Sequence, residues 1–171
     1  MMSNMTSNIL SILIWLPILG GILILSTGGD RSAQLARKIA LGFSAGTFLL
    51  SLSLYADFDM TTASMQFVER HTWIENLHIQ YSLGVDGISM PLIILTTLLT
   101  IIVVIAGWEV ITKRVAQYMA SFLIMEGLMI GVFSSMDAIL FYLFWEAMLI
   151  PMFLIIGVWG GSNRVYAAIK F

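Results

Sequence analysis

Two glutamates stand inside long apolar runs of the sequence, Glu126 in LIMEGLM and Glu146 in YLFWEAMLIP. A carboxylate at the middle of a bilayer costs at least ~2.5–3.5 kcal/mol, so an acidic residue in a membrane-spanning helix is a candidate for function. A carboxyl group that is loaded with a proton and unloaded near neutral pH would serve in a proton relay. The structural alternative is a protonated glutamate that donates one hydrogen bond to a neighbouring helix. Both interpretations are open, and function is favoured more strongly for Glu146 than for Glu126.

Pro151 follows Glu146 in the same apolar run. Because proline has no N–H, the carbonyl of Ala147 loses its usual helical donor and the helix tends to bend there. Within a membrane such a carbonyl attracts water, a side chain or a neighbouring helix. Water at this place would hydrate a proton path beside Glu146, and a kink that only aids packing explains the proline equally well.

The composition places these residues in a membrane protein. Hydrophobic residues make up 59% of the chain and charged residues 11%, whereas soluble domains average about 45–50% and about 25%. The absence of cysteine excludes disulfides, thiolate metal sites and cysteine-bound iron–sulfur clusters. His71 and His78 lie in the longest polar stretch, and the polar residues assemble no metal site, nucleotide motif or nucleic-acid-binding patch.

Five segments are long and apolar enough to cross a bilayer, which takes roughly 20 residues in a helix. We expect spans over residues 9–26, 39–55, 90–108, 118–135 and 138–158. A sixth helix begins near Val165 and still reads as helix at Phe171, so the chain is expected to be a truncated piece of a longer protein. The predicted fold is an all-α bundle of transmembrane helices that forms a single domain over residues 1–171.

The distribution of Lys and Arg predicts the orientation, because these residues accumulate on the cytoplasmic side of membrane proteins. Seven of the eight lie in connections on one side: Arg31, Arg37, Lys38, Lys113, Arg114, Arg164 and Lys170. The other side holds only Arg70. We therefore expect the N-terminus to face outward.

The segment 56–89 is then a long outer loop. Ile79, Tyr81 and Leu83 alternate with more polar neighbours, a pattern that fits a short strand. At the end of the loop, Asp86 or Ser89 is expected to cap the third span.

The two glutamates are expected at the same depth. The turn around residues 134–137 is short, so the fourth and fifth spans should be antiparallel neighbours. At about 1.5 Å per residue both glutamates lie ~15 Å from that turn, which is the centre of the hydrocarbon. If Glu126 and Glu146 face each other, burial and like-charge repulsion would keep a proton on at least one of them.

Two stretches resemble antiporter-like membrane subunits of respiratory complex I. The stretch YSLGVDGIS, residues 81–89, is similar to the segment that leads into the third span of those subunits. The stretch DAILFYLFWEAMLIPMFLIIGVWG, residues 137–160, looks like subunit M of bacterial NADH-quinone oxidoreductase, and residues 165–171 look like the start of its next helix. The pattern FWE…LIP is the specific part, and shorter versions of it recur in sodium/proton antiporter subunits.

The resemblance implies a multi-pass subunit of the bacterial inner membrane that moves protons, driven by electron transfer from NADH to quinone elsewhere in the complex. Glu146 falls on the family's essential carboxylate, and Glu126 on an acidic position found in some members only. The family's lysine partners lie in later, broken helices, and Lys170 is too early to be one of them.

The resemblance also assigns the cofactors and partners. NADH, flavin, iron–sulfur clusters and quinone are bound by other subunits in this family, so no cofactor or metal is expected in this chain. Its expected partners are the other membrane-arm subunits and the lipid bilayer, with no nucleic acid.

Two other functions stay open. A subunit of a multi-subunit sodium/proton antiporter would carry a similar motif without a redox partner, although the long run FWEAMLIPMFLIIGVWG favours the respiratory complex. A purely structural helix bundle would hold both glutamates as protonated hydrogen-bond donors, and a silent Glu146→Gln substitution would favour it.

Overall fold

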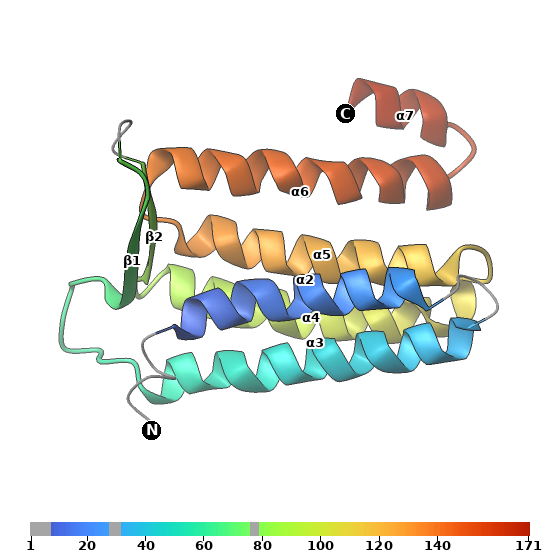
Figure 1. Ribbon diagram of the computed structural model, residues 1–171. Helices are drawn as coiled ribbons and strands as arrows, with labels where there is room; N and C mark the ends of the chain where they lie inside the picture. Colours follow the sequence, from blue (N-terminus) through green and yellow to red (C-terminus); the bar gives the residue numbers. More distant parts are fainter. Residues whose placement is uncertain (1–7, 28–31, 76–78) are drawn as a thin grey trace.

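The computed structural model describes residues 8–27, 32–75 and 79–171. Within these residues, five long helices lie side by side, and a two-stranded hairpin crosses one end of the bundle (Figure 1). The long helices are α2 (Ile9–Ser26), α3 (Ala33–Ala56), α4 (Ser89–Val110), α5 (Val115–Ser134) and α6 (Ala138–Trp159). The short helix α7 (Arg164–Lys170) packs against α6. Arg31 and His78, named above, lie outside the described residues.

The predicted bundle of membrane-spanning helices is confirmed. Five helices of the described chain are long and apolar enough to cross a membrane, and a further helix starts near the end of the chain. Two of them begin earlier than the apolar pattern indicated, α3 at Ala33 instead of residue 39 and α5 at Val115 instead of residue 118. Hydropathy marks the part of a helix that lies in hydrocarbon, whereas helical hydrogen bonding continues into the polar interface.

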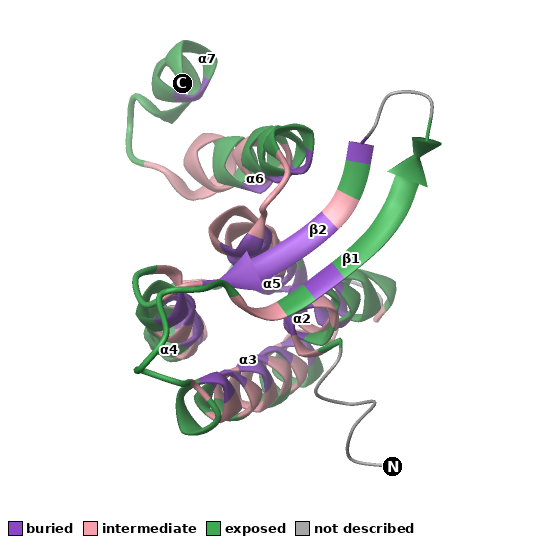
Figure 2. Cartoon of the chain, turned by 90° about the vertical axis from the view of Figure 1, so that its left-hand side faces the viewer, coloured by how far each residue is buried: buried purple, intermediate pink, exposed green. Residues whose placement is uncertain are grey.

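Helix α5 is the centre of the bundle, since it packs against α2, α3, α4 and α6 (Figure 2). Small residues let the neighbouring helices approach closely. A Cβ atom on Gly127 would lie 2.4 Å from the carbonyl oxygen of Ile14 in α2, and one on Gly131 would lie 2.7 Å from the ring of Phe144 in α6.

The outer loop holds an antiparallel hairpin, of which the sequence indicated only the second strand. Strand β1 (Gln66–Ile74) pairs with β2 (Ile79–Val85) and places Glu69 opposite Leu83. The sequence of β1 has no clear alternation, and its register shifts between Gln66 and Glu69, where Phe67 has a φ of 53°. The chain is therefore not purely α-helical as expected, because one small two-stranded sheet accompanies the helices.

The hairpin is fastened to the helices on both sides. The N–H of Met136, in the turn between α5 and α6, donates to the carbonyl of Ser82 at 2.9 Å. At the start of α4 the Asp86 carboxylate accepts the N–H groups of Ser89 at 2.7 Å and Ile88 at 3.0 Å. These two hydrogen bonds, that of Ser89 first, lower the pKa of Asp86 below its usual range. The expected capping of the third span by Asp86 is thus present.

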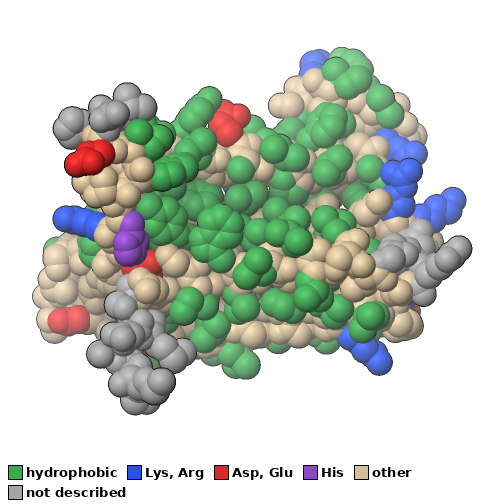
Figure 3. All heavy atoms as spheres, in the orientation of Figure 1, with side chains coloured by type: hydrophobic (Ala, Val, Ile, Leu, Met, Phe, Trp, Pro, Cys, Tyr) green, Lys and Arg blue, Asp and Glu red, His purple; other side chains and the backbone are tan. Residues whose placement is uncertain are grey.

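The two ends of the bundle differ in charge (Figure 3). We call the end that carries β1 and β2 the hairpin end, and the opposite end the basic end. The described Lys and Arg residues in the elements and connections that meet at the basic end, including α7, which begins there, are Arg37, Lys38, Lys113, Arg114, Arg164 and Lys170. Arg70 on β1 is the described basic residue at the hairpin end. That the hairpin end faces the outside stays a prediction.

Candidate functional site

Glu146 lies on the uncovered face of α6. Three residues of this helix are buried, Leu140, Phe144 and Pro151, and they form the stripe that packs against α5. Glu146 is exposed, and Tyr142, one helical turn earlier on the same exposed face, interacts with its carboxylate. The candidate proton carrier therefore opens to whatever surrounds α6.

Glu126, by contrast, is enclosed at the centre of the bundle. Its side chain is 1% exposed, and neither carboxylate oxygen has a hydrogen-bond partner among the described residues. The single hydrogen bond to a neighbouring helix that the structural alternative requires is therefore not seen in this part of the chain. A charge without a partner at this depth is costly, so this environment favours the neutral carboxylic acid.

A polar layer divides the hydrophobic core at the depth of Glu126. One apolar cluster, which includes Leu54 and Ile93, lies toward the hairpin end, and a second, which includes Ala40 and Val104, lies toward the basic end. Between these clusters the buried residues of α3 and α4 are hydroxyl-bearing: Ser44, Thr47, Ser51, Thr96, Thr97 and Thr100. On α5, Glu126 occupies the same interval. These seven residues are called the polar layer below.

The hydroxyl groups of the polar layer donate mainly along their own helices. Thr47 donates to the carbonyl of Phe43 at 2.8 Å, and Thr100 donates to that of Thr96 at 3.0 Å. Ser51 and Thr97 also join α3 to α4, with their oxygens 2.9 Å apart. A hydroxyl oxygen that donates its hydrogen still has lone pairs, which can accept from a protonated carboxyl group or from water. The layer thus holds hydroxyl acceptors in the same interval of the bundle as Glu126.

The structure does not bring the two carboxyl groups together. Glu126 and Glu146 each lie about 12 Å along their helix from the turn that joins α5 to α6, so the expectation of similar depth holds. Gly131, which meets Phe144 of α6, lies on a different face of α5 from Glu126. With Glu146 on the outer face of α6, the two residues occupy separate environments.

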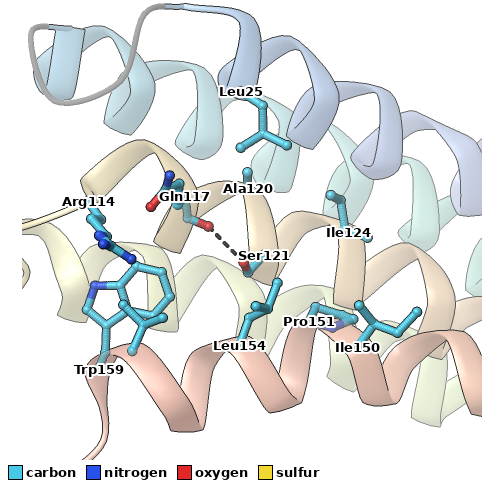
Figure 4. A pocket seen from close by; sticks show the side chains of 11 residues that line it. Leu25, Arg114, Gln117, Ala120, Ser121, Ile124, Ile150, Pro151, Leu154 and Trp159 are labelled. Atoms are coloured by element: carbon cyan, nitrogen blue, oxygen red, sulfur yellow. Dashed lines mark hydrogen bonds between the residues drawn. The ribbon is translucent and has the colours of Figure 1, made fainter.

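Pro151 lines a cavity of about 340 Å³ between α5 and α6 (Figure 4). Ser121 reaches this cavity from α5, and its hydroxyl donates to the carbonyl of Gln117 at 2.8 Å. Helix α6 continues past the proline to Trp159. The residues that line the cavity do not include Glu146, so the space lies on the α5 side of the helix and toward the basic end.

The sequence analysis missed a second buried carboxylate, Glu69 on β1, which is 3% exposed. It accepts the N–H groups of Leu10 at 2.7 Å and Ser11 at 3.3 Å, and also the Ser11 hydroxyl. The Tyr81 hydroxyl lies 3.0 Å from Ser11 Oγ. Glu69 therefore satisfies the first turn of α2, where free N–H groups favour a negative charge. Nothing in a polar loop sequence signals such a long-range contact.

The polar layer, in contrast, had a signal that was not used. Ser44, Thr47 and Ser51 recur at spacings of three and four residues inside an apolar span, as one face of a helix requires. Thr96, Thr97 and Thr100 do the same in the next span.

Comparisons with known proteins agree with the motif seen in the sequence. A family model described as NADH-ubiquinone oxidoreductase chain 4, amino terminus, matches residues 38–136, more than half of the chain. A second, described as NADH:quinone oxidoreductase/Mrp antiporter, TM, matches residues 135–171.

Similar proteins come from bacteria and plants. NADH-quinone oxidoreductase subunit M of Rhodobacter capsulatus is 50% identical over 167 residues, which are 96% of this chain and 32% of that protein. The subunit M of Rickettsia prowazekii is 42% identical over 95% of this chain and 34% of that protein. NADH-ubiquinone oxidoreductase chain 4 of Arabidopsis thaliana is 47% identical over 95% of this chain and 33% of that protein.

The chain spans about a third of the length of these relatives. The similarity extends over nearly all residues of this chain. It includes α5 and α6, the helices that carry Glu126 and Glu146. This chain therefore belongs to the family of NADH-ubiquinone oxidoreductase chain 4, which is called subunit M in the bacterial relatives.

Proposed function

We propose that this chain is part of a proton-translocating membrane subunit of a bacterial NADH-quinone oxidoreductase, in which Glu146 carries the transferred proton. The observation that supports this most is a carboxyl group near the middle of an otherwise apolar, exposed helix face. Ionisable residues at such depth almost always face a protein interior or a water-filled cavity and pair with other polar groups. The names of the bacterial relatives support the type of complex.

The exposed face of α6 is proposed to be covered by protein outside this chain. The relatives are about three times as long, so later helices of a full-length subunit are available for this role. A basic residue on such a helix would pair with Glu146 and raise or lower its proton affinity as the charge moves. The chain alone holds one half of such a device and is not expected to pump protons.

Glu126 is proposed as a second proton-binding group, separate from Glu146. Its burial favours the neutral acid, and the hydroxyl groups of the polar layer offer acceptors for its proton. Because the two glutamates do not face each other, we propose that protons reach Glu126 through the polar layer. Pro151 is proposed to act indirectly, by shaping the cavity on the α5 side of α6.

The remaining components follow from the same proposal. NADH, flavin, iron–sulfur clusters and quinone would be bound by other subunits, and other membrane-arm subunits would be the protein partners. The bacterial relatives support the bacterial inner membrane as the location, while the Arabidopsis relative shows that the family extends to plants.

A sodium/proton antiporter subunit is the second candidate, because the family model over residues 135–171 names the Mrp antiporter in its description. The two functions differ in their energy source. Proton movement that requires NADH oxidation supports the respiratory complex, whereas cation exchange without NADH supports the antiporter.

The test is NADH-driven proton pumping in membranes whose full-length subunit carries Glu146→Gln. We expect pumping to fall by about 100-fold or more, as for removal of a proton-transferring side chain, with the assembled complex still present on a native gel. Glu75→Gln, the same chemical change at an exposed position outside the helices, is the matched control. Undiminished pumping in the Glu146→Gln variant would leave the segment as a structural helix bundle.

A further inference from the structure

Two cavities adjoin each other at the basic end. The first is the space of about 340 Å³ between α5 and α6, with mainly aliphatic walls that include Ile124, Ile150 and Leu154. The second, of about 550 Å³, is lined by three cationic residues, Lys113, Arg114 and Arg164. Arg114, Val158 and Trp159 line both, so the two spaces adjoin and share part of their walls. In Figure 4, Arg114 and Trp159 lie together at one end of the first cavity, and Ile124 and Pro151 lie toward the other end.

The cationic residues are brought together from two connections that are far apart in the sequence. Lys113 and Arg114 lie between α4 and α5, and Arg164 begins α7. Trp159 fastens the two connections, since its Nε1 donates to the carbonyl of Lys113 at 3.0 Å. The guanidinium of Arg164 donates to the carbonyl of Val158 at 3.0 Å. The tertiary structure therefore fixes three positive charges around one opening.

The walls of the two adjoining cavities are complementary to an amphiphile with a negative head. Among the described residues that line them, none is acidic. Trp159 stands between the cationic and the aliphatic parts, which is the place that tryptophan favours at a membrane interface. Basic pockets between transmembrane helices are known to hold anionic lipid headgroups. A free phosphate ion would fill the cationic part and leave the aliphatic part without a ligand.

We propose that the two adjoining cavities together bind one anionic phospholipid, with its phosphate beside Lys113, Arg114 and Arg164 and one acyl chain between α5 and α6. Arginine suits phosphate because its guanidinium group can donate two parallel hydrogen bonds, and the ammonium of Lys113 adds a point charge. The lipid would fill the space beside Pro151 and tie α6 to α5 at the end of the bundle where the hairpin does not reach.

The experiment uses the complex that contains the full-length subunit, reconstituted in phosphatidylcholine vesicles with a trace of phosphatidylglycerol that carries a photoreactive diazirine in one acyl chain. After illumination, mass spectrometry of peptides locates and quantifies the crosslinks. We expect crosslinks in residues 117–124 and 150–158, at the walls of the aliphatic cavity. The double variant Lys113→Gln/Arg164→Gln should lower their yield by about 30-fold, because each basic residue near an anionic headgroup contributes a factor of about five.

The matched control is Lys38→Gln/Lys170→Gln, which removes the same charge at the basic end from residues that do not line either cavity. It should keep the yield of the unchanged protein. If the first double variant does not assemble, Lys113→Gln alone should lower the yield by about fivefold. A third variant, Leu154→Trp, should fill the aliphatic cavity and abolish the crosslinks while all three cations stay in place.

Three results would overturn the proposal. Equal yields in the two double variants would show that the cavity cations do not select the lipid. Equal labelling by a phosphatidylcholine probe would make the cavity a general acyl-chain groove. Displacement of the lipid by inorganic phosphate, at a concentration that leaves the ionic-strength control with sodium chloride unchanged, would assign the cationic part to free phosphate.

Discussion

Helices α5 and α6 carry the same functional group at the same depth and give it opposite surroundings. In the most apolar stretch of α5, 61% of the residues are buried, against 17% in α6. Glu126 on α5 is buried at the level of the hydroxyl-bearing faces of α3 and α4, whereas Glu146 on α6 is exposed. Figure 2 shows α5 inside the bundle and α6 largely exposed at its edge. The comparison teaches that the burial of an intramembrane carboxylate depends on the helices packed around it and not on its depth alone.

The two carboxyl groups also differ in what surrounds them within this chain. Glu126 is already enclosed within this chain, where the described residues offer its carboxylate no hydrogen-bond partner. Glu146 is exposed on α6, and a carboxylate exposed to hydrocarbon is unfavourable, which supports the proposal that further protein covers it. Helix α5 thus belongs to the core of this segment, whereas α6 lies at its edge.

The largest difference between the two sites is expected when each glutamate is replaced by lysine, which reverses the sign of the side-chain charge. Glu126→Lys should lower the free energy of unfolding of the chain in detergent micelles by about 3 kcal/mol, the cost of a lysine at the centre of a membrane helix. Glu146→Lys should change it much less, because an exposed lysine can extend toward polar headgroups. Thermal unfolding followed by circular dichroism measures both. A similar loss in the two variants would contradict the difference in burial.

The second largest effect is expected in the chemical reactivity of the two carboxyl groups. A hydrophobic carbodiimide reacts with protonated carboxyl groups that it can reach, and Glu146 is exposed while Glu126 is 1% exposed. Glu126 can react only after a local opening, and any opening that costs about 1.4 kcal/mol already slows the reaction tenfold. We expect peptide mapping of the chain in micelles to show modification of Glu146 at least about ten times faster. Equal rates would mean that α5 opens freely to solvent or detergent.

Glycine substitutions compare the packing of the two helices directly. Gly127→Ala in α5 should destabilise the chain by about 1–3 kcal/mol, as overpacking does, because the new Cβ would lie 2.4 Å from a backbone oxygen of α2. Gly157→Ala in α6 is the control, since its Cβ would meet the Cβ of Ala168 at an ordinary 3.5 Å. Chemical denaturation in micelles gives both values, and an equal cost at the two glycines would remove the contrast in enclosure.

The smallest expected effect concerns the start of α6. Asp137 Oδ1 accepts the N–H groups of Ile139 at 2.9 Å and Leu140 at 3.1 Å. These hydrogen bonds, that of Leu140 first, lower the pKa of Asp137 below its usual range. A lowered pKa in the folded state means that the stabilisation is present above about pH 4 and is lost as the pH falls through the lowered value.

Hydrogen exchange at the first amides of α6 measures this effect. Asp137→Asn should increase their exchange relative to the unchanged chain at about pH 5, and the difference should shrink as the pH falls through the lowered pKa of Asp137. Asp59→Asn is the control, because the pKa of Asp59 is also lowered, by hydrogen bonds from Thr61 in a loop away from α6. A difference that does not depend on pH would assign the effect to something other than the charged cap.

The sequence predicted the helices more accurately than the contacts between them. Long apolar runs must become helices in a membrane, because only helices satisfy their own backbone there, and the predicted spans agree with the structure apart from early starts of α3 and α5. The hairpin was half missed because β1 lacks alternation. The buried role of Glu69 was missed because its partners lie in α2, far away in the sequence.

Residue type and spacing alone determined that two carboxyl groups lie deep in a membrane protein, and the FWE…LIP run indicated the family. Tertiary structure decided which of them is enclosed, that they do not face each other, and that Lys113, Arg114 and Arg164 meet around one opening. The physical reason is the rotation of each helix about its axis. Insertion depth depends on hydropathy summed along a helix, whereas orientation depends on packing against neighbours, which here rests on close contacts such as Gly127 against Ile14 and Gly131 against Phe144.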